Sequence, residues 1–179
     1  MEITADEFAA ALATFRVSAF RLEVQPVYIE PVEQELLSRF TAGEFATPDE
    51  VPEIAFWFDQ VAALTAAGRS ITRVRVQTEP PTLYQQFEQW ADPWNVAAGE
   101  HIRYMSESTA RRVGLFPATE GQDWWLLDDR VVIQFAHDSD GRRLKYHRTT
   151  DREQIARAAE WRDLAILHSA PATGRSTVA

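Results

Sequence analysis

The chain has 179 residues, of which 45% are hydrophobic and 11% aromatic, so its length fits one domain with a sizeable core. It contains no cysteine, which excludes disulfides, a thiol nucleophile and a zinc site built from cysteine. The net charge of −9 falls on residues 1–60, where twelve acidic residues stand against three arginines. Direct nucleic-acid binding is therefore not expected there, because phosphate contacts require Lys or Arg. Apolar runs stay far below the roughly 20 residues that span a bilayer, so we expect a cytoplasmic protein without a membrane partner.

The first part of the chain alternates helical and extended patterns. Apolar residues at helical spacing predict helices over 4–15, 33–40 and 51–67, and the segments 19–28 and 71–77 are typical of strands.

The middle of the chain predicts a strand–helix–strand unit. Pro80 and Pro81 open a helix that runs to about Trp90, DPWN at 92–95 is typical of a turn, and 101–105 is a short strand. We expect this unit to be a right-handed crossover between parallel strands.

The last part of the chain combines a hairpin with two helices. The elements expected in order are a short helix over 106–115, a loop over 117–122, two strands around Asp128-Asp129 within 123–137, a hairpin turn at DSDG (138–141), a strand over 142–148 and a helix over 151–169.

These elements predict an α+β (mixed α/β) fold. Residues 1–170 form a single globular domain, in which a mixed central sheet of about five or six strands is flanked by helices, and residues 171–179 form a flexible tail.

Charged residues are threaded through the otherwise apolar segment 71–105. Charges inside core-forming elements need partners, so these residues form either a structural ion-pair network or the lining of a site. The candidate ligand-binding pocket consists of Arg73, Arg75, Glu79, Tyr84, Glu88, Asn95, Glu100, Arg103, Trp124 and Asp128.

Two adjacent tryptophans, Trp124 and Trp125, lie on one predicted strand. Side chains of neighbouring strand residues point to opposite faces, so one ring is expected in the core and the other at the surface or over a groove. Aromatic rings beside arginines are enriched in ligand pockets and in protein interfaces.

Recognised catalytic and phosphate-binding motifs are absent from the sequence, and we predict neither a metal nor a cofactor. His137 and His147 flank the DSDG turn, and an ordinary hairpin end explains them better than a metal site. The carboxylates Glu88, Glu100 and Asp128 leave one catalytic alternative open, in which one of them is a general base.

Six segments occur in order: FRVSAFRLEV, RVRVQTEPPTLYQQFE, NVAAGEHIRYM, DWWLLDDRVV, FAHDSDGR and AEWRDLAILHSAP. Over roughly residues 8–171 the chain resembles an uncharacterised actinobacterial domain family that is often encoded beside helix-turn-helix regulators. The resemblance implies a regulatory protein partner and carries over no chemistry.

The chain is also distantly similar to phospholipase-D-like folds, some of whose members are inactive regulatory domains. An active member would carry His-x-Lys followed by a downstream Asp, whereas here Lys145 precedes His147. Phosphodiesterase activity of that type is therefore not expected.

The leading hypothesis is a non-catalytic, cytoplasmic regulatory or interaction domain. It binds a helix-turn-helix regulator through an acidic surface that includes Glu30, Glu33 and Glu35, and senses a small ligand in the candidate pocket. The alternative is a hydrolase or transferase with a carboxylate general base and arginines that hold an anionic substrate.

Overall fold

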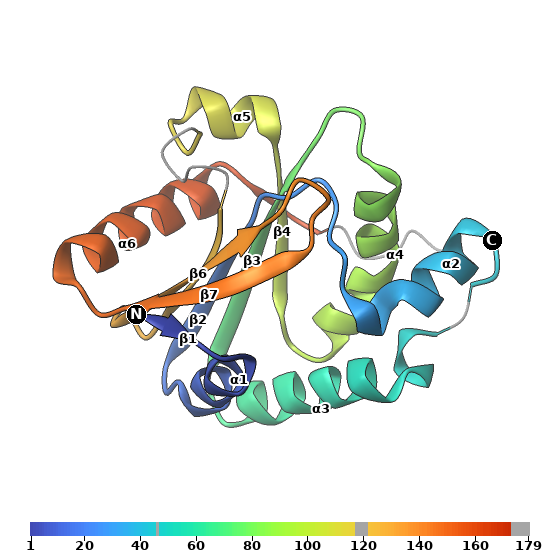
Figure 1. Cartoon of the computed structure of the whole chain (residues 1–179), viewed down its shortest axis with the longest axis horizontal. Helices are drawn as coiled ribbons and strands as arrows, with labels where there is room; N and C mark the ends of the chain where they lie inside the picture. Colours follow the sequence, from blue (N-terminus) through green and yellow to red (C-terminus); the bar gives the residue numbers. More distant parts are fainter. Residues whose placement is uncertain (46, 117–121, 173–179) are drawn as a thin grey trace.

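The computed structural model describes residues 1–45, 47–116 and 122–172, and within them one mixed sheet has eight strands (Figure 1). The strands are β1 (Glu2–Ile3), β2 (Ser18–Glu23), β3 (Ser70–Gln77), β4 (His101–Ser106), β5 (Asp123–Leu127), β6 (Val131–His137), β7 (Arg143–Thr149) and β8 (Ala170–Pro171). Their order across the sheet is β1-β7-β6-β5-β2-β3-β4-β8. The predicted α+β fold is confirmed.

Helices cover both faces of this sheet (Figure 1). They are α1 (Ala5–Thr14), α2 (Gln34–Thr41), α3 (Pro52–Ala66), α4 (Leu83–Ala97), α5 (Glu107–Arg112) and α6 (Arg152–Leu167), with 3₁₀ turns at Pro31–Glu33 and Pro48–Glu50. Helices α5 and α6 pack on one face, and α1, α2, α3 and α4 gather on the other. Within the described ranges, no helix is both long and apolar enough to cross a membrane.

The two faces of the central strands differ in chemistry because successive side chains alternate. Parallel strands β2 and β3 pair Leu22 with Val74, and these residues join the apolar core under α5 and α6. The alternate positions carry charges, with Arg21 opposite Arg73 and Glu23 opposite Arg75. The charged face is therefore the one covered by α1, α2, α3 and α4.

The predicted parallel unit is confirmed, since β3 and β4 are parallel neighbours joined by α4. The turn predicted at 92–95 is wrong, because α4 continues through Pro93 to Ala97. Asp92 is drawn into an ion pair with Arg75, and the Asn95 amide oxygen accepts a hydrogen bond from Trp57. These tertiary contacts outweigh the local turn preference of the DPWN sequence.

The sheet has more strands than the five or six predicted. The additional strands, β1 and β8, have two residues each and pair antiparallel with β7 and β4 at opposite edges. Two residues are too few to show an alternating pattern, so the sequence could not reveal them. The start of the predicted flexible tail is therefore part of the sheet at Pro171, whereas its remainder (173–179) and most of the predicted loop (117–121) lie outside the described residues.

Asp128 belongs to the turn between β5 and β6 and does not lie near the charged face. It and Asp129 have φ angles of 54° and 52°, and Arg130 donates its N–H to the Leu127 carbonyl, as in a type I′ turn. The Asp128 carboxylate accepts the backbone N–H groups of residues 16–18 at 2.7–3.0 Å. Burial acts to raise its pKa, but these N–H donors outweigh that effect and lower it. Asp128 therefore fastens the start of β2 to the hairpin.

We predict that Asp128→Gly lowers the free energy of unfolding by about 1–3 kcal/mol, because three N–H groups lose their acceptor. Asp128→Ala loses the same bonds and adds about 1 kcal/mol of strain, since alanine disfavours a positive φ. Asp128→Asn keeps one acceptor oxygen and serves as the control with the smallest loss. Urea denaturation of the three variants checks this order, and a glycine variant as stable as the wild type would contradict it.

Candidate functional site

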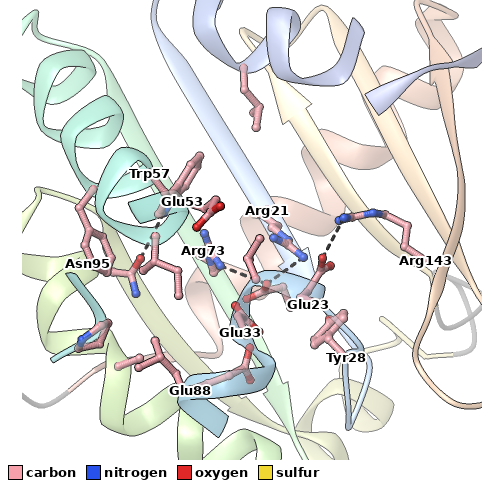
Figure 2. A pocket seen from close by; sticks show the side chains of 18 of the residues that line it. Arg21, Glu23, Tyr28, Glu33, Glu53, Trp57, Arg73, Glu88, Asn95 and Arg143 are labelled. Atoms are coloured by element: carbon pink, nitrogen blue, oxygen red, sulfur yellow. Dashed lines mark hydrogen bonds and ion pairs between the residues drawn. The ribbon is translucent and has the colours of Figure 1, made fainter. Parts of the chain in front are cut away.

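A cavity of about 370 Å³ lies over the charged face of β2 and β3 (Figure 2). Its floor is charged, and its walls are largely apolar and aromatic side chains from α1, α3, α4 and the segment 28–36. Its lining includes Phe8, Arg21, Glu23, Tyr28, Glu30, Glu33, Glu53, Trp57, Arg73, Arg75, Tyr84, Phe87, Glu88, Ala91, Asn95, Trp125, Phe135 and Arg143.

The floor is organised around Glu23, the last residue of β2. One carboxylate oxygen lies 3.0 Å from Arg21 Nη2 and 3.2 Å from Arg73 Nη1, and the other lies 3.0 Å from Arg75 Nε. Glu23 is only 4% exposed, so these contacts form in a poorly solvated setting where ion pairing is strong. Burial acts to raise the pKa of Glu23, but Arg21, Arg73 and Arg75 outweigh it and lower the pKa from 4.5 to about 2.

The two arginines of β3 each have further carboxylate partners. Arg75 Nη1 lies 3.2 Å from both Glu88 Oε1 and Asp92 Oδ1, which α4 presents one turn apart. Arg73 Nε donates to Glu100 Oε1 at 2.9 Å. Helix α4 is thus held to the sheet by charge in addition to apolar packing.

Arg21 connects the floor to β5 and to the segment after β2. Its Nη2 lies 3.4 Å from Asp123 Oδ2, which also accepts the Tyr28 hydroxyl at 2.6 Å. Gly141 in the β6–β7 turn fixes this segment, because it accepts the Ile29 N–H at 3.0 Å and a Cβ there would lie 2.2 Å from the Val27 carbonyl oxygen. Only glycine permits this approach, which places Tyr28 on the cavity wall.

The walls contribute three further polar contacts. The Tyr84 hydroxyl donates to Glu33 Oε2 at 2.5 Å, and Trp57 Nε1 donates to Asn95 Oδ1 at 3.4 Å. On the far side of the cavity, Arg143 Nη2 donates to Glu30 Oε2 at 2.9 Å (Figure 2).

Carboxyl groups outnumber arginines in the buried part of this network. Arg21, Arg73 and Arg75 face five carboxyl groups, those of Glu23, Glu88, Asp92, Glu100 and Asp123. Burial raises the pKa of Asp92 and of Asp123 from 3.8 to about 6, and it raises that of Glu88 well above its ordinary value. Burial thus favours the protonated form of these three carboxyls relative to exposed ones.

Five of the candidate pocket residues line the cavity: Arg73, Arg75, Tyr84, Glu88 and Asn95. Glu100 lies beneath them as the partner of Arg73.

The other four candidates lie elsewhere. Glu79 is exposed after β3, and Asp128 holds the β5–β6 turn. Arg103 shares the opposite sheet face with Val74 and donates to Ser169 and the Ile166 carbonyl. Trp124 packs on that same opposite face, against Phe20 and Trp161.

Both tryptophans of the pair are buried, at 2% and 1% exposure, so the alternative of a ring at the surface is wrong, and Trp125 fits the alternative of a ring over a groove. Trp125, not Trp124, lines the cavity, because it shares a sheet face with its cross-strand partner Arg21.

The three residues of the predicted acidic surface, Glu30, Glu33 and Glu35, differ in their surroundings. Glu30 and Glu33 line the cavity and are paired with Arg143 and Tyr84, so they are not free surface charges. Glu35 is exposed on α2, as a surface role requires.

The sequence reasoning missed Arg21, Glu23, Tyr28 and Asp123. Arg21 and Glu23 carried a usable signal, since in FRLEV they alternate with apolar residues as Arg73 and Arg75 do in TRVRV. Two neighbouring strands with charges at this period place those charges on one face. Tyr28 and Asp123 carried no comparable signal, because their contacts join segments far apart in the chain.

We predict that the protein becomes more stable as the pH falls from 7 to about 5, because the gain from Asp92 and Asp123 exceeds the opposing effect of His137, a half-buried group whose pKa burial lowers from 6.5 to about 4. Asp92 and Asp123 bind protons more tightly when folded, so their contribution is complete below pH 4 and lost as the pH rises through 6. Each carboxyl contributes at most about 3 kcal/mol for a shift of this size. The contribution of Glu23 has the opposite sign and is lost as the pH falls from 4.5 towards 2. Urea denaturation across this range measures both limbs.

Asp92→Asn is the control for the upper limb. The variant removes one titrating group while keeping an acceptor for the Tyr104 hydroxyl, so the rise in stability between pH 7 and 5 becomes smaller. A wild-type stability that declines steadily from pH 7 to 5 would overturn the assignment.

Comparison with known proteins places this geometry in context. No curated protein matches the chain. Among solved structures, the chain is similar to the crystal structure of Nuc, a phospholipase D family member from Salmonella typhimurium, with a TM-score of 0.53 and 10% sequence identity over 94% of this chain and 90% of that one. At this identity the similarity concerns the fold alone, and it confirms the fold-level resemblance seen in the sequence. The model of the family described as "Domain of unknown function (DUF6879)" matches residues 6–174, so the chain belongs to that family.

Proposed function

We propose that this domain is a non-catalytic regulatory domain that binds a small ligand in the cavity and transmits its occupancy to a protein partner. The observation that carries the proposal is the cavity itself, whose size falls within the roughly 300–1,000 Å³ of ligand pockets. Apolar walls above a few fixed polar groups are the usual composition of such pockets. The cysteine-free chain fits a reducing compartment such as the cytoplasm.

The ion-pair network supports a site as well as the fold. A network that serves packing alone gains nothing from a cavity above it, because water in the cavity weakens the ion pairs. Here Glu23, Arg73 and Arg75 are nearly sealed yet line the cavity. Their mutual contacts fix their positions before any ligand arrives, which lowers the entropic cost of binding.

The network argues against the enzyme alternative. Arg21, Arg73 and Arg75 already have at least two carboxylate partners each, so an anionic substrate would have to compete for them. Of the candidate bases, Glu100 is paired with Arg73, and Asp128 lies in the β5–β6 turn outside the cavity.

The proposed partner is a helix-turn-helix regulator, as the resemblance found in the sequence implies. Of the three acidic residues first considered for this contact, Glu35 alone is exposed, on α2, next to the Tyr84–Glu33 contact in the cavity wall. Glu33 and Glu35 lie two residues apart, where the 3₁₀ turn leads into α2. A ligand that displaces Glu33 would therefore also shift Glu35, and ligand binding would alter the surface that contacts the partner.

We predict that Glu35→Lys weakens binding to a purified helix-turn-helix regulator of the same host, and that the loss shrinks at high salt because surface charges are screened. Glu160→Lys is the matched control, since Glu160 is exposed on α6 at the other face of the sheet. Surface plasmon resonance compares the two variants. Equal affinities for both would remove Glu35 from the contact.

We predict that a ligand from a small-molecule library raises the melting temperature of the wild type but not of Ala91→Leu. Ala91 lines the cavity, so three added carbon atoms occupy ligand space, whereas Ala97→Leu places them on the exposed side of the same helix. A ligand at 100 times its dissociation constant stabilises the folded state by about 2.7 kcal/mol. Differential scanning fluorimetry measures the shift in all three proteins.

The comparison decides whether the cavity is the site. Ala97→Leu retains the ligand-dependent shift, and circular dichroism confirms that Ala91→Leu is folded. A ligand that stabilises both variants equally binds elsewhere and contradicts the proposed site, and a broad library without any ligand contradicts the proposed function.

A further inference from the structure

The charges around the cavity define the class of ligand it can accept. We propose that the occupant is an organic cation, an ammonium or guanidinium group carried on an apolar body. This inference rests on the proposed function and deepens it.

Carboxyl groups exceed cations around the cavity by a wide margin. Four arginines line it, against the five glutamates 23, 30, 33, 53 and 88. Asp92, Glu100 and Asp123 lie directly beneath, as partners of the same arginines. An added anion would meet this excess in a setting of low dielectric, whereas an added cation would be attracted by it.

The arginines contribute little free positive charge. The single carboxylate of Glu23 contacts three of the four arginines. The fourth, Arg143, donates a hydrogen bond to Glu30 at 2.9 Å. Arg75 further shares one nitrogen between Glu88 and Asp92. Their effect is to cancel carboxylates, which leaves the remaining carboxyl groups to meet the ligand.

Glu88 and Glu33 are the groups placed to receive the cationic head. Glu88 is 8% exposed, touches Arg75 through Oε1 at 3.2 Å, and accepts no hydrogen bond from the described part of the chain. Glu33 accepts only the Tyr84 hydroxyl among the residues described. The two come from different walls, α4 and the 3₁₀ turn at 31–33, and Figure 2 shows them close to each other at the cavity.

The protonation of these groups agrees with the geometry. Burial raises the pKa of both carboxyls, and the charge of Glu33 contributes to the rise at Glu88. A positive charge placed beside these carboxyls favours their ionised form and opposes that rise. A bound ammonium group would therefore favour the release of a proton from them.

The aromatic walls suit the same ligand. The Arg73 guanidinium lies 5.9 Å from the Trp57 ring centre, and that of Arg21 lies 5.9 Å from the Tyr28 ring centre. Aromatic faces attract cations in this range, and the attraction grows when water is excluded. The walls therefore stabilise positive charge already, and Tyr84 and Phe87 add apolar surface for the body of the ligand.

Three probes that share a phenylethyl body test the charge preference: phenethylamine, 2-phenylethanol and 3-phenylpropionate. Isothermal titration calorimetry at pH 7 measures each dissociation constant with the intact domain. The amine is expected to bind tightest, by about tenfold over the alcohol, which corresponds to about 1.4 kcal/mol, and the carboxylate is expected to bind weakest.

Two variants assign the preference to residues. Glu88→Gln and Glu33→Gln each reduce the amine's affinity about tenfold and change the alcohol's affinity less, because only the charged head loses its partner. Glu160→Gln, exposed on α6 at the other face of the sheet, is the matched control and leaves the amine's affinity unchanged.

Proton release gives a second readout. The amine's binding heat depends on the ionisation enthalpy of the buffer if Glu88 loses a proton, and the alcohol's does not. The charged or titrating groups that face Glu88 include Arg75 on β3, Glu23 on β2, Asp92 and Tyr84 on α4, Tyr28 after β2 and Glu33 on the 3₁₀ turn. The Glu33→Gln variant therefore reports on coupling between the two carboxyls.

Several outcomes would contradict the preference for a cationic ligand without contradicting the cavity as a ligand site. If the carboxylate binds tightest, or if the three probes bind equally and lose affinity in Ala91→Leu, the cavity is a ligand site with a different preference. If no probe binds, the cation inference is rejected, and the proposed function then stands or falls on the library comparison of Ala91→Leu with Ala97→Leu.

Discussion

A single carboxylate, that of Glu23, holds three guanidinium groups on the face of the two central strands. Removing charges from water is costly, and a buried ion pair repays that cost only with good geometry. The parallel register supplies the geometry, because it sets Glu23 beside Arg75 and Arg21 beside Arg73. The same contacts in turn make the register unambiguous. The cavity floor, the position of α4 and the orientation of Arg21 all depend on this one group.

The sheet has two different faces because its central strands alternate apolar and charged residues. The apolar face closes tightly under α5 and α6, where Trp124 and Leu126 are fully buried. The charged face cannot be covered in this way, since helices that packed flat against it would bury unpaired polar groups. The helices on that side meet it at its margins, through α1 and α3 at one end and α2 and α4 at the other, and the cavity is what lies between them.

Local patterns in the sequence are sufficient for the main elements and for half of the candidate site. Arg73, Arg75, Tyr84 and Glu88 lie on periodic segments that were predicted as a strand and a helix, and the structure brings them together. The failures share one cause, which is that a contact distant in the chain decided the outcome. Asp128, Arg103 and Trp124 sit on correctly predicted elements but on the wrong face or end, and strand register, which fixes the face, is not encoded locally. Residues 92–95 likewise form part of α4 and not the predicted turn, because Asp92 pairs with the distant Arg75.

The triple contact of Glu23 has a consequence for how such a domain can diversify. Replacing Glu23 removes one carboxylate partner from each of three buried arginines at once, so a change in the floor charges is costly as a single substitution. The wall residues Phe8 and Phe87 contact their neighbours through apolar packing, and single replacements of similar volume there are tolerated. Substitutions in the walls can therefore change which ligand shape the cavity accepts, while the floor keeps the same preference for ligand charge.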